Sequence, residues 1–241
     1  MRWARAPLRR VALVIAVLGA LGLVGGTTLW VVTPDPSDIH ARLQAITKAR
    51  GVPLMGENDV PPRLAEAVVA IEDERFYEHH GIDSIGLSRA LLYDVTNLCL
   101  CQGGSTITAQ LVKDVYLGGS DRGFNKVVDM VLALKVERVL NKKQILAYYL
   151  SEITSGYGRY GVIEASCAYF RAPLDRLTLG QYALLAGVTQ APSVYDPTVN
   201  PDLAQQRRAQ VLSKMVVQHV ITAAQAQTAN AEPVTATGPG C

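Results

Sequence analysis

The sequence has almost no net charge, and its basic residues form no cluster interleaved with aromatic residues. Its 241 residues include 23 lysines and arginines against 21 aspartates and glutamates, which leaves a formal net charge of +2. Proteins that bind nucleic acid through its phosphates need a basic patch or stripe. We therefore expect no nucleic-acid partner.

Cysteine and histidine are scarce, with four of each. No CxxC pair or HxxxH pattern accompanies them, so their spacing does not favour a metal site. Cys99 and Cys101 are separated by one residue, which rarely allows disulfide geometry between the two. Either of them could pair with Cys167 or Cys241, or all could be small buried apolar residues, and the sequence leaves this open.

Strand patterns are nearly absent too, and no internal repeat is found. Apolar residues recur instead at the spacing of helices, so a mainly α-helical protein is predicted. Pro61-Pro62 opens one helix, which runs into an acidic stretch and is stopped by Gly81. A long helical stretch is one helix, or two with a joint near Asn141. The predicted helices cover residues 39–48, 63–80, 107–117, 124–152, 174–189 and 203–219.

Apolar residues are abundant, at 49% of the chain. Residues 11–32 carry no charge, and this run is long enough to span a hydrocarbon core of ~30 Å. Arginines precede the run and aspartates follow it, so we expect the N-terminus in the cytoplasm and the rest outside the cytoplasmic (inner) membrane. A cleaved signal peptide is the alternative, but its apolar core is typically ~7–15 residues long.

These features divide the chain into segments. The segments are a cytoplasmic basic tail (residues 1–10), a transmembrane anchor (11–32), a linker (33–58), a main helical domain (59–222) and a flexible tail (223–241). The tail is assigned from its alanine, threonine, proline and glycine content, which offers little apolar surface to bury.

Residues 71–81 bring four carboxylates, an arginine, two aromatic rings and two histidines together. Glu72 of this stretch and Asp129 fall on different predicted helices, where they could flank one groove. Glycosyl chemistry uses such a pair of carboxylates, and nearby basic side chains suit a phosphate-bearing leaving group. The competing interpretation is that these charges only face solvent. The basic residues available to the groove are Arg89, Lys113 and Lys126.

Residues 82–101 are unusually apolar for a segment beside a charged site. The simpler interpretation is an ordinary core helix. In a membrane-anchored protein, the segment could also dip into the outer leaflet to meet a substrate with a lipid tail.

Five segments carry motifs in a fixed order. Residues 72–81 read Glu-Asp-x-x-Phe-x-x-His-x-Gly, and residues 103–113 read Gly-Gly-Ser-Thr-Ile-Thr-Ala-Gln-Leu-Val-Lys. Residues 124–152, 190–197 and 207–215 follow. Together they resemble the motifs of the peptidoglycan glycosyltransferases, glycosyltransferase family 51, which occur as monofunctional transglycosylases and as N-terminal modules of class A penicillin-binding proteins.

This resemblance implies a mainly helical, lysozyme-like fold with a hydrophobic jaw at the membrane, and makes residues 59–222 the glycosyltransferase domain. Its implied substrate is lipid II, a disaccharide-pentapeptide joined through pyrophosphate to a polyprenyl tail, and its product is a growing β-1,4 glycan strand. Glu72 would be the general base that takes the proton from the acceptor 4-hydroxyl, with Asp129 as the second catalytic carboxylate. No tightly bound cofactor is implied, but a divalent cation, Mg or Mn, would suit the pyrophosphate leaving group. The positions assigned to substrate binding are Asp73, Phe76, His79, Arg89, Ser105, Thr106, Gln110, Lys113 and Lys126.

The third motif departs from the family pattern Arg-Lys-x-x-Glu, because residues 125–129 read Asn-Lys-Val-Val-Asp. Asparagine cannot replace the bidentate arginine donor. Aspartate is shorter than glutamate by one C–C bond, and a misplacement on the order of 1 Å can cost ~100-fold in rate. Ala109 and Ser151 stand where the family has glutamine and asparagine, and Arg122 could restore some of the lost charge.

We interpret the chain as an active glycan polymerase. The alternative is a degenerate relative that binds lipid II or glycan as a scaffold or regulator with little activity, and a lysozyme-like hydrolase is a third interpretation. No set of Ser-x-x-Lys, Ser-x-Asn and Lys-Thr-Gly motifs follows the fifth motif. We therefore expect a separate transpeptidase to cross-link the strands.

Overall fold

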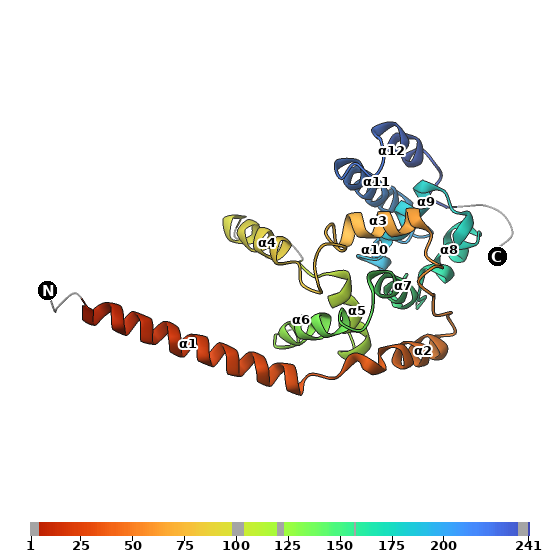
Figure 1. Cartoon of the computed structure of the whole chain (residues 1–241). Coiled ribbons are helices and arrows are strands. Elements are labelled where there is room, and N and C mark those ends of the chain that lie inside the picture. Colours follow the sequence, from red (N-terminus) through yellow and green to blue (C-terminus); the bar gives the residue numbers. More distant parts are fainter. Residues whose placement is uncertain (1–4, 98–103, 120–122, 157, 236–240) are drawn as a thin grey trace.

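The computed structural model describes residues 5–97, 104–119, 123–156, 158–235 and 241. Over these residues the chain forms helices joined by turns, with no extended strand and one isolated bridge between Thr154 and Tyr160 (Figure 1). The prediction of a mainly α-helical protein is confirmed. The elements in chain order are α1 (Arg5–Val32), η1 (Pro36–Asp38), α2 (Ile39–Arg50), α3 (Pro62–Glu72), α4 (Ser84–Asn97), α5 (Ile107–Tyr116), α6 (Asn125–Val136), α7 (Lys142–Glu152), α8 (Val162–Phe170), η2 (Leu174–Arg176), α9 (Leu179–Val188), α10 (Pro192–Tyr195), α11 (Pro201–Val217) and α12 (Ala223–Asn230).

The core of the domain is built around α9. This helix is apolar on all sides, and residues 182–188 are buried. It packs against α3 and α11, while α5 packs against α6 and α7. The end of α3, the middle of α5 and the end of α9 thereby approach one another, and this is where the candidate site lies.

Side-chain caps fix where several helices begin. Thr106 Oγ1 accepts a hydrogen bond from the Ala109 N–H at 3.1 Å at the start of α5. Asn141 and Gln144 form a capping box at the start of α7, so the predicted helical stretch over residues 124–152 is two helices joined at Asn141. The helices predicted over residues 39–48 and 203–219 are found as α2 and α11, and η2 precedes α9 where one helix was predicted.

α3 begins at Pro62 as predicted, but it ends at Glu72 and does not continue to Gly81. Residues 73–81 turn back instead, because His79 Nε2 lies 3.0 Å from both carboxylate oxygens of Asp73. Gly81 has a φ of 95°, and a Cβ there would lie 2.7 Å from the backbone of Ala133. Only glycine fits this close approach without strain. The prediction of one continuous helix through the acidic stretch is wrong.

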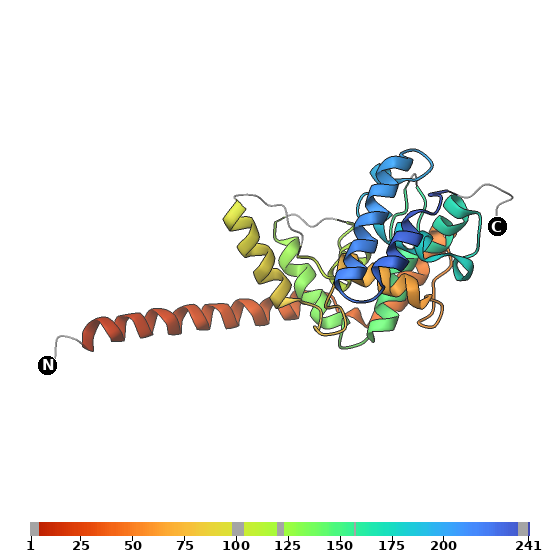
Figure 2. The same cartoon turned by 90° about the horizontal axis from the view of Figure 1, so that it is seen from above.

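α1 is long and apolar enough to cross a membrane, with a mean hydropathy of 2.0 over its apolar window and 0% of that window buried. Its end is fastened to α6. The Trp30 ring lies 5.1 Å from Lys135 Nζ and 4.3 Å from the Arg138 guanidinium carbon, and Lys135 Nζ donates to Thr33 O at 2.7 Å. Figures 1 and 2 show α1 leaving the folded body on the side from which α4 also projects.

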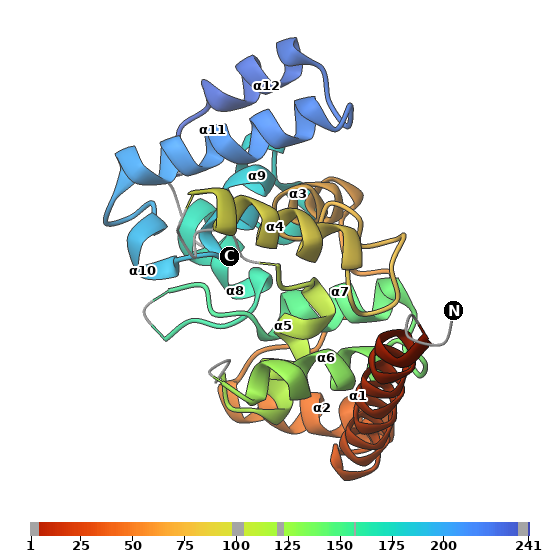
Figure 3. The ribbon, with the colours of Figure 1, turned by 90° about the vertical axis from the view of Figure 1, so that its left-hand side faces the viewer.

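α4 turns an apolar face outward. Ile85, Leu92 and Val95 are 63%, 65% and 63% exposed. Figure 3, which looks at this side of the molecule, shows α1 and α4 in front of the core helices. The simpler prediction of an ordinary core helix is wrong for the described part of this segment, and residues 98–101 lie outside the described residues.

The chain after residue 222 is folded back on the domain as far as residue 235. A capping box of Thr222 and Gln225 starts α12. Arg208, fully buried on α11, donates to Asn230 O at 2.7 Å and to Glu232 O at 2.6 Å. The prediction of a flexible tail is therefore wrong for residues 223–235. The short helices α8, α10 and α12 were not predicted from the sequence.

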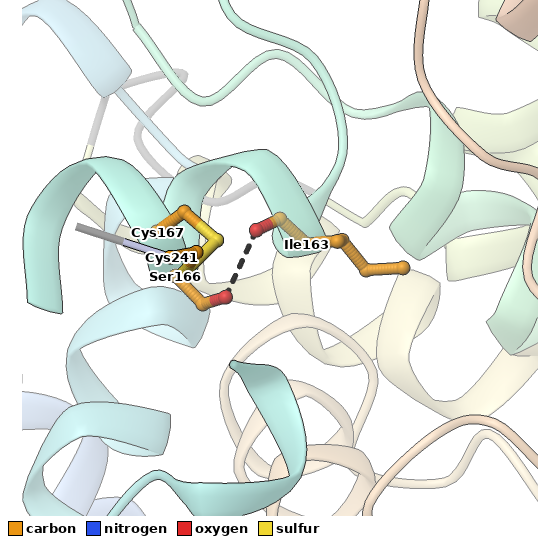
Figure 4. Close-up of a disulfide and its surroundings, with 4 residues drawn as sticks. All are labelled: Ile163, Ser166, Cys167 and Cys241. Carbon is orange, nitrogen blue, oxygen red and sulfur yellow. Dashed lines mark hydrogen bonds between the residues drawn. A yellow bond between two sulfur atoms is a disulfide. The ribbon is translucent and has the colours of Figure 1, made fainter. Parts of the chain in front are cut away.

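A disulfide joins Cys167 on α8 to Cys241, with the two Cα atoms 5.5 Å apart (Figure 4). Beside it, Ser166 Oγ donates to Ile163 O at 2.9 Å. Cys167 and Cys241 are thus partners of each other, which excludes the pairing of either one with Cys99 or Cys101 that the sequence left open. Those two cysteines lie outside the described residues.

Candidate active site

Glu72 is the last residue of α3, and donors from two other helices hold its carboxylate. Gln110 Nε2, on α5, donates to Glu72 Oε2 at 2.9 Å. Thr189 Oγ1, which follows the last turn of α9, lies 3.1 Å from Glu72 Oε1. Each oxygen of the carboxylate therefore has its own donor, and the side chain has a defined direction.

A buried tyrosine on α7 orients the Gln110 amide. Tyr149 Oη donates to Gln110 Oε1 at 3.2 Å, which leaves the amide nitrogen facing Glu72. Burial, and after it the negative charge of Glu72, raises the pKa of Tyr149 well above its usual value. The phenol therefore stays protonated and acts as a donor at physiological pH.

Glu72 lies between two hollows and lines both. The larger has a volume of about 600 Å³, and Gln110, Lys113 and Thr189 line it. The smaller has a volume of about 80 Å³ and lies toward α4. The charged and hydroxyl-bearing residues that line the smaller hollow with Glu72 are Asp73, Glu74, Asp83, Arg89, Ser105 and Thr106.

Asp73, Phe76 and His79 were predicted to bind substrate, and the structure shows them holding the loop after Glu72. Asp73 Oδ2 accepts from the Ile107 N–H at 3.0 Å, which ties the loop to the start of α5. His79 Nδ1 accepts from the Gly81 N–H at 3.2 Å. Phe76 is 0% exposed, so the predicted contact of its ring with substrate is excluded in this conformation.

Ser105 and Thr106, the two residues before α5, contact α6 and the loop that ends at Gly81. Lys126 Nζ, on α6, donates to Ser105 Oγ, and Thr106 Oγ1 donates to Gly81 O at 2.8 Å. Arg89 on α4 is exposed and lies 3.9 Å from a carboxylate oxygen of Glu74. Ser105, Thr106 and Arg89 thus line the smaller hollow together.

Asp129 lies on α6 and is only 1% exposed. It lines neither of the two hollows beside Glu72. The structure therefore does not place it in a cavity shared with Glu72, where the sequence predicted a second catalytic carboxylate. Asn125 is the first residue of α6, and Arg122 lies outside the described residues.

The family model for transglycosylases matches residues 40–216, which include every element that builds this site. The chain belongs to the transglycosylase family.

Several curated relatives share this transglycosylase region. Penicillin-binding protein 1A of Haemophilus influenzae is 42% identical over 178 residues, covering 74% of this chain and 21% of that protein. Penicillin-binding protein 1F of Bacillus subtilis is 39% identical over 172 residues, covering 71% and 24%. A Cupriavidus necator protein named "Putative transglycosylase" is 41% identical over 207 residues, covering 85% and 86%.

The chain spans only about a fifth of the length of the penicillin-binding protein 1A relatives from Haemophilus influenzae and Vibrio cholerae, 21% and 22%. A crystal structure of the Haemophilus influenzae protein gives a TM-score of 0.47 at 25% identity, covering 77% of this chain and 18% of that one.

Some residues of this transglycosylase site were not singled out from the sequence. Thr189 directly precedes the fourth motif, and Tyr149 lies inside the third. Asp114 lines the larger hollow, and burial raises the pKa of its carboxyl in spite of the neighbouring Lys113. The sequence does carry one signal for Thr189, because its hydroxyl stands at the end of a helix that is otherwise apolar.

The side chains of this transglycosylase site do not form a metal cage. Within the described ranges, no three His, Cys, Asp or Glu residues are grouped so that they could hold a metal ion. Both oxygens of Glu72 already lie at hydrogen-bond distance from protein donors. The Mg or Mn ion was expected at the pyrophosphate of the substrate and not as a resident group of the protein, so it stays a prediction.

Proposed function

We propose that this protein is a peptidoglycan glycosyltransferase that polymerises lipid II into β-1,4 glycan strands. The observation that carries the proposal is the Glu72 carboxylate, held by two donors at the boundary of two hollows. Polymerisation requires a donor and an acceptor to meet at one base, and a carboxylate with space on both sides meets that requirement.

In the proposed reaction Glu72 takes the proton from the 4-hydroxyl of the acceptor sugar. The oxygen attacks C1 of the donor, inverting that centre, and the bond to polyprenyl pyrophosphate breaks. Gln110 and Thr189 keep the base pointed at the reacting hydroxyl, and a general base acts only within hydrogen-bond reach of the proton that it removes.

Positive charge on both sides of Glu72 supports a phosphate-bearing leaving group. Lys113 lines the larger hollow, and Arg89 lines the smaller. Lysine and arginine side chains stabilise the charge that develops on pyrophosphate as the bond breaks. A hydrolase of plain glycan would have no use for these cations.

We also propose that the protein works at the outer surface of the cytoplasmic membrane, with α1 as a single-pass anchor and its N-terminus in the cytoplasm. The exposed apolar face of α4 lies on the same side as α1 and would enter the outer leaflet, where the polyprenyl tail of lipid II lies (Figure 3). Peptide cross-linking would fall to a separate transpeptidase.

A second candidate function rests on Asp129. Its burial, outside both hollows, would leave the protein without its second carboxylate, and it would then bind lipid II or a glycan strand as a scaffold or regulator. Retention of Glu72, Gln110 and Lys113 around one cavity favours the active enzyme over this alternative.

Purified full-length protein with labelled lipid II in detergent tests the proposal. Glycan polymer on a gel is the expected product, binding without polymer would indicate the scaffold, and saccharide released from preformed glycan would indicate a hydrolase. Glu72→Gln should abolish polymerisation, because the amide cannot accept the proton. Glu78→Gln, the same change at an exposed position of the following loop, should leave the rate unchanged.

A further inference from the structure

We infer that Thr189 is a positioning residue for Glu72: its hydroxyl holds the carboxylate in place when charged and accommodates it when protonated. The inference rests on the proposed function, in which Glu72 is the base. Thr189 Oγ1 lies 3.1 Å from Glu72 Oε1, a contact between residues 117 positions apart. Gln110 binds the other oxygen, so loss of Thr189 would free one side of the carboxylate.

Besides the Tyr149 phenol, the Thr189 hydroxyl has two acceptors for its single proton. Its oxygen also lies 2.9 Å from Ala186 O, one turn back along α9. A hydroxyl can donate once and accept at its lone pairs. While Glu72 is ionised, the proton of Thr189 is drawn to the charged oxygen, since hydrogen bonds to ionised groups are the stronger ones.

Proton transfer to Glu72 reverses the arrangement. A Glu72 carboxyl protonated on Oε1 can donate to Thr189 Oγ1, while the Thr189 proton turns to Ala186 O. Neither state leaves a half-buried polar atom without a partner, and no heavy atom needs to move. The hydroxyl thus suits a base that gains one proton and loses it again in each catalytic cycle.

The backbone that carries Thr189 is firmly held. Arg207 on α11 is buried, and its Nε donates to Gly187 O at 3.1 Å in the last turn of α9. A Cβ at Gly187 would lie 2.8 Å from Arg207 Cγ, so the two helices are in close contact there. A hydroxyl on such a rigid support can fix the direction of the carboxylate to within a fraction of an ångström.

Other charged and titratable groups surround Glu72, and substitutions of Thr189 leave all of them in place. They are Lys113 and Asp114 on α5, Tyr149 on α7, Arg207 on α11, Arg89 on α4, and Asp73, Glu74 and Asp83 between α3 and α4.

The test compares Thr189→Val, which keeps the shape and removes the hydroxyl, with Thr189→Ser, which keeps the hydroxyl. For Thr189→Val we expect kcat to fall about tenfold with little change in KM, since one hydrogen bond to a charged group is lost. The acid limb of the pH profile of kcat/KM should move to higher pH, because the charged form of Glu72 loses a donor. Thr189→Ser should restore both the rate and the profile.

Several outcomes would overturn the inference. A Thr189→Val protein with the wild-type rate and pH profile would do so, as would a Thr189→Ser protein that is equally impaired. A change in KM alone would make Thr189 a substrate contact. Thr189→Ala, which needs less space, repeats the comparison if the valine variant does not fold. If the wild-type protein makes no polymer, both the proposed function and the role of Thr189 are wrong. If the wild-type protein is active and the Thr189→Val variant is equally active, only the role of Thr189 is wrong.

Discussion

At the scale of single residues, the unusual aspartate of the third motif lies in the packed interior. Asp129 is 1% exposed on α6. Asp129→Glu would restore the family residue, but an extra methylene in a packed interior typically costs about 1–3 kcal/mol. We expect the variant to unfold at lower temperature and to polymerise lipid II no faster than the wild type. Thermal unfolding and initial polymerisation rates measure both effects.

Asp129→Asn is the matched control, because it keeps the size and removes the charge. If the charge matters for activity, the asparagine variant will lose rate while keeping its stability. A faster Asp129→Glu enzyme would contradict the expectation, and would show that the shorter side chain limits a carboxylate that reaches the substrate.

Residues of the candidate site that lie in motifs could be located from the sequence, and residues that join it through tertiary contacts could not. Glu72, Gln110 and Lys113 lie in two motifs, and all three line one cavity. Thr189 reaches Glu72 only after α9 has packed against α3, which no local pattern reveals. Phe76 shows the opposite error, since a conspicuous motif position serves the core and not the ligand.

At the scale of elements, capping residues were more informative than composition. A joint near Asn141 was one of two possibilities for residues 124–152, and the capping box of Asn141 and Gln144 shows that the chain forms this joint. Thr222 and Gln225 form the same type of cap before α12, yet the alanine-rich and proline-containing composition of the tail favoured disorder. The structure shows that an overlooked cap, together with carbonyls bound by Arg208, outweighs that composition.

The outward face of α4 carries the prediction that belongs to this scale. Leu92 and Val95 are 65% and 63% exposed, so Leu92→Glu with Val95→Glu should leave folding intact. Placing charges in the hydrocarbon boundary is unfavourable. We expect the apparent KM for lipid II in vesicles to rise about tenfold or more, since each 1.4 kcal/mol is tenfold in affinity. A water-soluble, short-tailed lipid II analogue should be polymerised at the wild-type rate.

Asn97→Glu is the control for this double variant. Asn97 is exposed on the same helix and lies about 140° around its axis from Leu92, so the added charge does not fall on the face of Leu92 and Val95. Equal losses with the vesicle and the soluble substrate would indicate damage to the site, and no loss with either would rule out contact between α4 and the membrane.

At the scale of the whole molecule, one covalent bond ties the described C-terminal residue to the domain. The disulfide between Cys167 and Cys241 closes a loop over a sequence separation of 74. Closing a loop of this size restricts the unfolded chain, and native disulfides typically contribute about 2–4 kcal/mol. Replacing both cysteines by serine should therefore lower the thermal midpoint by about 5–10 °C.

The same double variant should polymerise lipid II at the wild-type rate at 25 °C, because neither cysteine lines the hollows beside Glu72. Arg208 would still bind the carbonyls that follow α12, so the tail would remain docked in the folded state. Differential scanning calorimetry with a parallel activity assay measures both quantities. An unchanged thermal midpoint would mean that packing alone holds the C-terminal residues and that the disulfide adds no stability. A loss of activity at 25 °C would show that α8 transmits the position of the tail to the site.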